Sequence, residues 1–73
     1  MKKWSVFYKE NKIYYQVYVD KVGRYWLGGS RLDWILTNTK KEAEQIAKKI
    51  RKQNEPYFRD GKIIVLRVEL KRV

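Results

Sequence analysis

Apolar and polar residues alternate with a period of two over most of the chain. This period is typical of β-strands, because successive side chains of a strand point to opposite faces of the sheet. Short stretches that favour turns separate the alternating segments, at 10–12, 20–23 and 60–61. The pattern predicts strands at residues 4–9, 13–19, 24–27, 31–37 and 63–70, with 31–37 open to being a loop.

Residues 39–54 have the pattern of one amphipathic helix. Thr39 and Glu42 have the spacing of a capping box, in which each side chain satisfies a free backbone N–H of the first turn. Four apolar residues then recur at the spacing of one helix face, namely Ala43, Ile46, Ala47 and Ile50. The helix should end between Lys52 and Asn54, because Pro56 cannot continue it.

The order β-β-β-β-α-β predicts an α+β fold in a single domain spanning residues 1–73. We expect a mostly antiparallel sheet of four to five strands with the helix on one face. The helix should cover the more apolar strand face, comprising Trp4, Val6, Tyr8, Ile13, Tyr15, Val17, Val19, Tyr25, Leu27, Leu32, Trp34, Leu36, Ile64, Leu66, Val68 and Leu70. The opposite face then carries Phe7, Lys9, Tyr14, Gln16, Tyr18, Arg24 and Trp26, with Arg31 and Arg67 at its margins.

The charge of the chain indicates the kind of partner. Its 73 residues include 18 Lys and Arg against 8 Asp and Glu, a formal net charge of +10. Such a charge attracts polyanions, namely DNA, RNA or an anionic membrane surface. The chain has no cysteine, no signal-peptide pattern and no apolar run of membrane-spanning length. We therefore expect a soluble, cytoplasmic protein with no membrane partner.

The face opposite the helix combines the side chains that nucleic acid requires. Bases stack on aromatic rings, by about 1–3 kcal/mol per base, while lysine and arginine neutralise phosphates. We expect four rings to stack or pack, those of Phe7, Tyr14, Tyr18 and Trp26. We expect phosphate contacts from Lys9, Lys12, Lys21 and Arg24, and a base-edge contact from Gln16. A second phosphate contact is expected on the helix, at Lys48, Lys49 and Lys52.

Other interpretations of the same residues stay open. Aromatic pairs stabilise a hairpin even on a wet face, and helical lysines are commonly a solvated surface. Tyr57 and Phe58 could fold over part of the aromatic face. The face could also bind protein, since interface cores are rich in aromatic residues and arginine. The alternative function is therefore a small interaction or inhibitor protein, of a phage or mobile element, that binds an acidic host protein or its own twin.

Residues 6–52 resemble a known family of small DNA-binding domains. Three strands with aromatic and basic residues precede the segment TNTKKEAEQIAKKI at 37–50. This arrangement resembles the domains at the N-terminus of phage and transposon integrases. The resemblance implies a three-stranded sheet in the major groove, a helix packed behind it, and DNA rather than RNA as the polymer. The residues that it would turn toward DNA are Lys9, Tyr14, Gln16, Tyr18, Arg24 and Trp26. The chain departs from that family by a fourth strand, by a long strand after the helix and by lacking a recombinase catalytic domain.

The residue types that commonly carry catalysis are scarce. The chain contains no histidine and no cysteine, so the commonest general base and the thiol nucleophile are both missing. Ser5 and Ser30 have no base nearby in the sequence. Most carboxylates fall in turns or on the helix, where turn formation, capping and ion pairing explain them. We therefore expect no enzymatic activity, no metal site and no cofactor, with a hydrolase built from Asp20, Asp33 or Asp60 as the enzymatic alternative.

Overall fold

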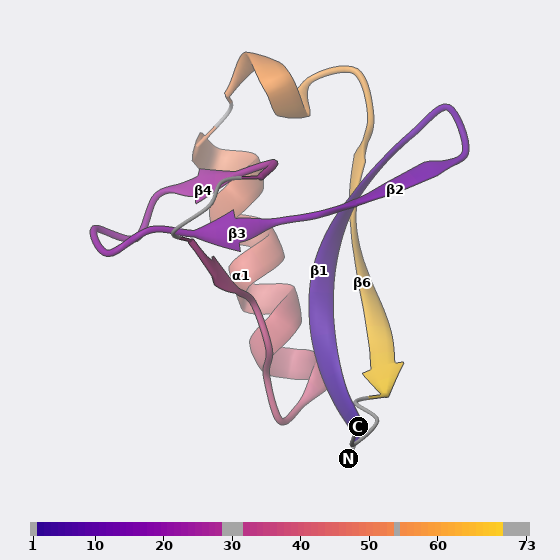
Figure 1. Ribbon diagram of the computed structural model, residues 1–73, viewed down its shortest axis with the longest axis vertical. Helices are drawn as coiled ribbons and strands as arrows, with labels where there is room; N and C mark the ends of the chain where they lie inside the picture. The colour runs from indigo at the N-terminus through magenta and orange to yellow at the C-terminus, as the bar shows by residue number, and fades with distance from the viewer. Residues whose placement is uncertain (1, 29–31, 54, 70–73) are drawn as a thin grey trace.

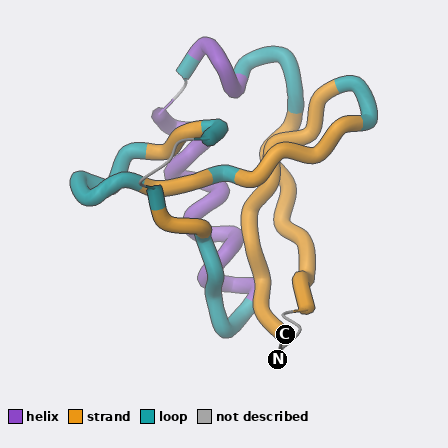
Figure 2. Tube along the Cα trace, viewed as in Figure 1, coloured by secondary structure: helices purple, strands orange, loops and turns teal. Residues whose placement is uncertain are grey.

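The computed structural model describes residues 2–28, 32–53 and 55–69, and these form one long helix and strands of unequal length (Figure 1). The elements are, in chain order, β1 (Lys2–Glu10), β2 (Ile13–Gln16), β3 (Tyr18–Val19), β4 (Tyr25–Trp26), β5 (Asp33–Trp34), α1 (Lys40–Gln53), the short 3₁₀ helix η1 (Pro56–Phe58) and β6 (Lys62–Glu69). The first and last strands pair antiparallel along their length, so the first and last described residues, Lys2 and Glu69, lie side by side (Figures 1 and 2).

The strands form two antiparallel sheets of three strands each, with the orders β2-β1-β6 and β4-β3-β5. The predicted α+β class is confirmed, whereas the predicted single sheet of four to five strands is not. The predicted strand 13–19 divides at Val17: β2 pairs with β1, while β3 pairs with β4 and β5. Alternation along one segment does not reveal that its two halves take different partners, and this caused the error.

The segment that follows β5 connects the second sheet back to the first. Thr37 forms an isolated antiparallel bridge with Trp4, in which Trp4 N donates to Thr37 O at 3.0 Å and Thr37 N donates to Trp4 O at 2.9 Å. Of the predicted strand 31–37, only Asp33–Trp34 is a regular strand, and Arg31 lies outside the described residues.

The helix forms where the sequence predicts it. The hydroxyl of Thr39 accepts a hydrogen bond from the Glu42 backbone N–H at 3.2 Å and donates one to the Glu42 carboxylate at 2.9 Å. The helix ends at Gln53, and Pro56 begins η1. Of the predicted stripe, Ala43, Ala47 and Ile50 are buried and Ile46 is half-buried.

The core lies between α1 and one face of the first sheet and includes residues from the second sheet and its connections, namely Val17, Tyr25 and Ile35. Its buried apolar residues are Val6, Tyr8, Val17, Tyr25, Ile35, Ala43, Ala47, Ile50, Phe58 and Ile63. In the β1–β6 ladder Val6 pairs with Val65 and Tyr8 with Ile63, so Ile63 and Val65 face the helix.

The predicted helix-facing side of the last strand is therefore wrong. Ile64, Leu66 and Val68 lie on the opposite face of the sheet, and Arg67, paired with Trp4, lies on the helix side rather than at the margin of that face. Residues 63–66 are apolar at both alternate positions, so the pattern does not distinguish the two faces. Pairing with β1 makes the choice. The predicted core position Leu70 lies outside the described residues.

Three further residues assigned to the core differ from the structure. In the segment after β5, Ile35 is 4% exposed while the predicted core residue Leu36 is 38% exposed, because the bridge at Trp4 sets the phase of this segment. Ile13 is 53% exposed and Tyr15 is also exposed, because the β1–β2 hairpin extends beyond the helix (Figure 1).

Within the described residues, no helix has the length and apolar character needed to cross a membrane.

Candidate nucleic-acid interface

One face of the first sheet, on the side away from α1, carries apolar, aromatic and basic side chains in rows across the strands. Directly paired residues of antiparallel strands share a face, so the strand registers define each row. Lys9 lies between Tyr14 and Lys62, and Phe7 lies between Gln16 and Ile64. Ser5 pairs with Leu66, and Lys3 with Val68. We call these residues the outer sheet face: Lys3, Ser5, Phe7, Lys9, Tyr14, Gln16, Lys62, Ile64, Leu66 and Val68.

The outer sheet face is partly accessible: Tyr14, Lys62 and Leu66 are exposed, whereas Ser5 is fully buried and its hydroxyl donates a hydrogen bond to the Ile35 carbonyl oxygen at 2.5 Å. Tyr14 is 51% exposed and Leu66 is 37% exposed, while Phe7, Ile64 and Val68 are half-buried. The ammonium group of Lys9 lies 5.2 Å from the centroid of the Tyr14 ring, in a cation–π contact. Helix α1 packs on the opposite face of the first sheet, against Val6 and the rest of the core (Figure 1). An exposed ring is therefore held beside a positive charge.

The hairpin that joins β1 and β2 presents a further lysine. Its two turn residues have positive φ, 51° at Asn11 and 67° at Lys12, which is the backbone of a type I′ turn. Both side chains are exposed at the tip of the hairpin. Glycine is the residue usually favoured at the second position of this turn, so Lys12 occupies a conformation that costs it free energy.

The second sheet has an aromatic row of its own. Tyr18 pairs with Trp26 on one side and with Trp34 on the other, and all three rings are half-buried. The Tyr18 hydroxyl donates a hydrogen bond to the side-chain oxygen of Gln16. Gln16, on the outer sheet face, is therefore linked to the aromatic row of the second sheet.

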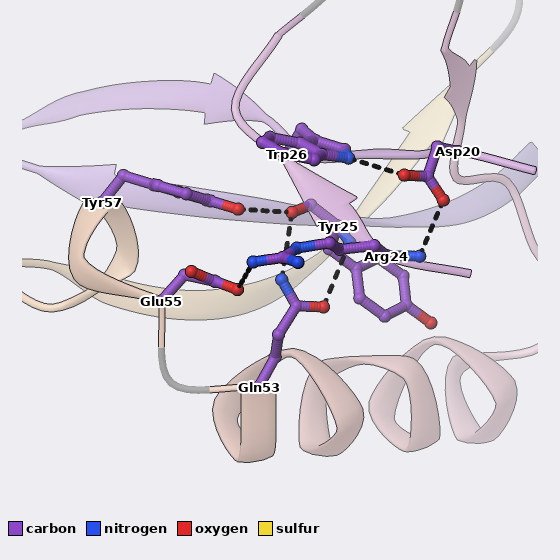
Figure 3. A network of polar contacts seen from close by, with 7 residues as sticks. All are labelled: Asp20, Arg24, Tyr25, Trp26, Gln53, Glu55 and Tyr57. Carbon is purple, nitrogen blue, oxygen red and sulfur yellow. Dashed lines mark hydrogen bonds and ion pairs between the residues drawn. The ribbon is translucent and has the colours of Figure 1, made fainter. Parts of the chain in front are cut away.

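Trp26 is held in a network at the turn between β3 and β4 (Figure 3). Its indole N–H donates to the Asp20 carboxylate at 2.9 Å, and the backbone N–H groups of Val22 and Arg24 donate to the other carboxylate oxygen at 3.0 and 2.9 Å. These hydrogen bonds, the one from Trp26 foremost, lower the pKa of Asp20. The Tyr57 ring stacks on Trp26 with a centroid separation of 5.9 Å.

The same network engages Arg24 and the end of α1. The Arg24 guanidinium pairs with the Glu55 carboxylate, which raises the pKa of Arg24, and it lies 5.3 Å from the Trp26 ring. Gln53 accepts a hydrogen bond from Tyr25 N at 3.1 Å and donates one to Tyr25 O at 3.2 Å. These contacts fasten β4 to the C-terminal end of the helix (Figure 3).

The structure thus divides the residues predicted to bind nucleic acid into groups. Phe7, Lys9, Tyr14 and Gln16 share the outer sheet face, with Lys12 at the tip of their hairpin. Arg24 and Trp26 belong to the second sheet and to the network that Tyr57 partly covers, as one of the alternative interpretations anticipated. The exposed Lys21 lies in the turn between β3 and β4, and Lys48, Lys49 and Lys52 are exposed on α1.

Six residues of the outer sheet face were not predicted to be there, among them Lys3 and Ser5, which were assigned to neither face. Ile64, Leu66 and Val68 were assigned to the core, and Lys62 was not assigned at all. Lys62 lies beside Lys9 only through the β1–β6 register, since the two are 53 positions apart in the sequence. No local signal could have found that neighbourhood.

The described residues contain no group of three or more histidine, cysteine, aspartate or glutamate side chains placed to hold a metal ion. Comparison of the chain with models of protein families, with curated proteins and with solved structures finds no match.

Proposed function

We propose that this protein is a non-enzymatic nucleic-acid-binding module that contacts its ligand through the outer sheet face. The observation that carries the proposal is the exposed Tyr14 ring beside Lys9, on a sheet face that the helix does not cover, in a chain with a net charge of +10. A ring of this exposure offers a base a stacking surface, and the adjacent ammonium group offers a phosphate its counterion.

The residues have separate roles in this proposal. Tyr14 stacks a base and Phe7 extends the apolar surface beside it, while Lys9, Lys12 and Lys62 contact phosphates. Arg24 and Trp26, which were expected to contact the ligand, support the fold of the second sheet instead. The positive charge of Arg24 is already paired with Glu55.

A pair of charge-matched variants tests the proposal. One variant changes Lys9, Lys12 and Lys62 to Gln, and the control changes Lys48, Lys49 and Lys52 to Gln, so that both lose the same charge. Fluorescence anisotropy with a labelled oligonucleotide measures affinity at several salt concentrations. Each phosphate contact contributes about 0.7 to the slope of log affinity against log salt for a single strand and about 0.9 for a duplex. The first variant should therefore lose about 2 units of slope with a single strand, or about 2.7 with a duplex, and the control much less.

Equal losses in the two variants would show that the overall charge, rather than the outer sheet face, attracts the polymer. They would also support the phosphate contact predicted on the helix. If wild-type protein binds no oligonucleotide even at low salt, the proposal fails.

A second candidate function is binding of an acidic protein through the same face. The observation that favours it is the row of Ile64, Leu66 and Val68 on the outer sheet face, because aliphatic side chains suit a protein interface. Such binding would depend less steeply on salt than contact with a polyanion. Sedimentation at micromolar concentration would also separate a self-associating protein, of doubled mass, from a monomer that binds nucleic acid.

A further inference from the structure

We infer that the nucleic acid is single-stranded and that unpaired bases lie flat on the outer sheet face. This inference rests on the proposed function and adds to it the class of polymer. Three features of the described residues carry it: no arginine lies on the face, its one amide side chain is already hydrogen-bonded, and its centre is mostly apolar.

Sequence-specific duplex binding depends on side chains that reach base edges, most often arginine paired with guanine. Among the described residues, none of those on the outer sheet face is arginine. Arg24 lies in the second sheet and pairs with Glu55, and Arg67 lies on the helix side of β6. The described arginines, whose side chains most often read guanine in a major groove, therefore lie away from this face.

Gln16 is the one amide side chain of the outer sheet face. Its side-chain oxygen already accepts a hydrogen bond from the Tyr18 hydroxyl. Bidentate contact with adenine needs both the oxygen and the NH₂ group of the amide. Reading adenine in that way would require the Gln16 oxygen to accept from the Tyr18 hydroxyl and from the base together, so the contact with Tyr18 restricts the orientations in which Gln16 can reach a base edge.

The centre of the face is mostly apolar, and its basic residues lie toward the ends. Lys9 and Lys62 form one row, and Lys3 lies six residues away along β1, about 20 Å at the rise of a strand. Between them lie Phe7, Ile64 and Leu66, together with the fully buried Ser5, whose hydroxyl is already hydrogen-bonded to the Ile35 carbonyl oxygen. A duplex keeps the flat faces of its bases stacked inside and presents phosphates and polar base edges at its surface. A bound duplex would therefore offer this apolar strip no apolar surface to contact. Unpaired bases expose those flat faces and can cover it.

The test compares three labelled ligands of about 12 nucleotides, within the range of site sizes of small single-strand-binding folds. They are single-stranded oligothymidylate, a duplex of the same length, and an abasic strand that keeps the phosphates but lacks the bases. At moderate salt we expect the single strand to bind more tightly than the duplex. Loss of each stacked base should weaken binding by about 5- to 140-fold, so the abasic strand should bind far more weakly than oligothymidylate.

Two variants assign the effect to a residue. Tyr14→Ala should lower affinity for oligothymidylate by a factor in the same range while leaving affinity for the abasic strand unchanged. Tyr14→Phe keeps the ring and should bind oligothymidylate like the wild type. Because Tyr14 is 51% exposed, both variants should fold, and circular dichroism checks this.

The outcomes separate the two proposals. Duplex binding as tight as single-strand binding, or equal binding of the abasic strand and oligothymidylate, overturns the inference and leaves nucleic-acid binding standing. Failure of all three ligands to bind wild-type protein at low salt overturns the proposed function itself.

Discussion

Gly61 lies immediately before β6, where the chain passes close to the backbone of β1. A Cβ atom added at this position would lie 2.3 Å from the carbonyl oxygen of Lys9 and 2.7 Å from the nearest ring atom of Tyr8. The Lys9 backbone is paired with Lys62 in the β1–β6 ladder, so it cannot move alone. The Tyr8 ring is 2% exposed and contacts Phe58 edge to face, so it too lacks room. Gly61→Ala should therefore force β1 and the entry to β6 apart.

The size of the effect follows from the contact distances. The Cβ atom must move by about 0.7 Å or more before its distance to the Lys9 oxygen reaches the shortest that real Cβ atoms show. Extra methyl groups in packed regions cost about 1–3 kcal/mol, and a clash with backbone belongs in the upper part of that range. We expect a loss of about 2–3 kcal/mol in the free energy of unfolding, which in a domain of this size lowers Tm by roughly 10–20 °C.

Gly23→Ala is the matched control. Gly23 has a φ of 88° but has no atoms within 4 Å of an added Cβ, so its substitution adds conformational strain and no clash. That strain costs about 1–2 kcal/mol. Thermal and urea unfolding, followed by circular dichroism, should rank Gly61→Ala below Gly23→Ala in stability. A change of less than about 0.5 kcal/mol in the free energy of unfolding is usual for a surface site without special contacts. If Gly61→Ala changes stability by no more than this, the close packing of this turn on β1 is refuted.

Two further predictions concern the hairpin tip and the turn after β3. Lys12→Gly should raise the free energy of unfolding by about 0.5–1 kcal/mol in urea titrations, because glycine accepts the φ of 67° that strains lysine, and should weaken nucleic-acid binding in anisotropy, because it removes a phosphate contact. Lower stability, or unchanged affinity, would contradict these two assignments. Since hydrogen bonds lower the pKa of Asp20, its carboxylate stabilises the folded state above the ordinary pKa of about 3.9, and this contribution is lost as pH falls through the lower folded pKa. Asp20→Asn should therefore reduce the dependence of stability on pH in acid, measured as urea midpoints against pH. An unchanged pH profile would show that the Trp26–Asp20 hydrogen bond does not contribute to stability.

The sequence by itself determines the features that depend on neighbouring residues. The capping pair Thr39 and Glu42, the apolar stripe and Pro56 specify the helix and its end, because helical hydrogen bonds connect residues four apart. Alternation of apolar and polar residues identifies strand segments because it, too, depends only on residues close together in the sequence. Within the β1–β2 hairpin it also placed Phe7, Lys9, Tyr14 and Gln16 correctly on one face, since a two-residue turn fixes the register of its own strands.

Only the tertiary structure decides what depends on pairing between distant segments. The register of β6 on β1 moved Ile64 and Leu66 from the predicted core to the outer sheet face and placed Lys62 beside Lys9. The pairing of Arg24 with Glu55, 31 positions apart, and the stacking of Tyr57 on Trp26 place these two predicted contact residues in a network of the second sheet. A strand that is apolar at both alternate positions, as at 63–66, can turn either side to the helix with little local difference in energy. Its partner strand makes that choice, and with it the composition of the face that remains exposed.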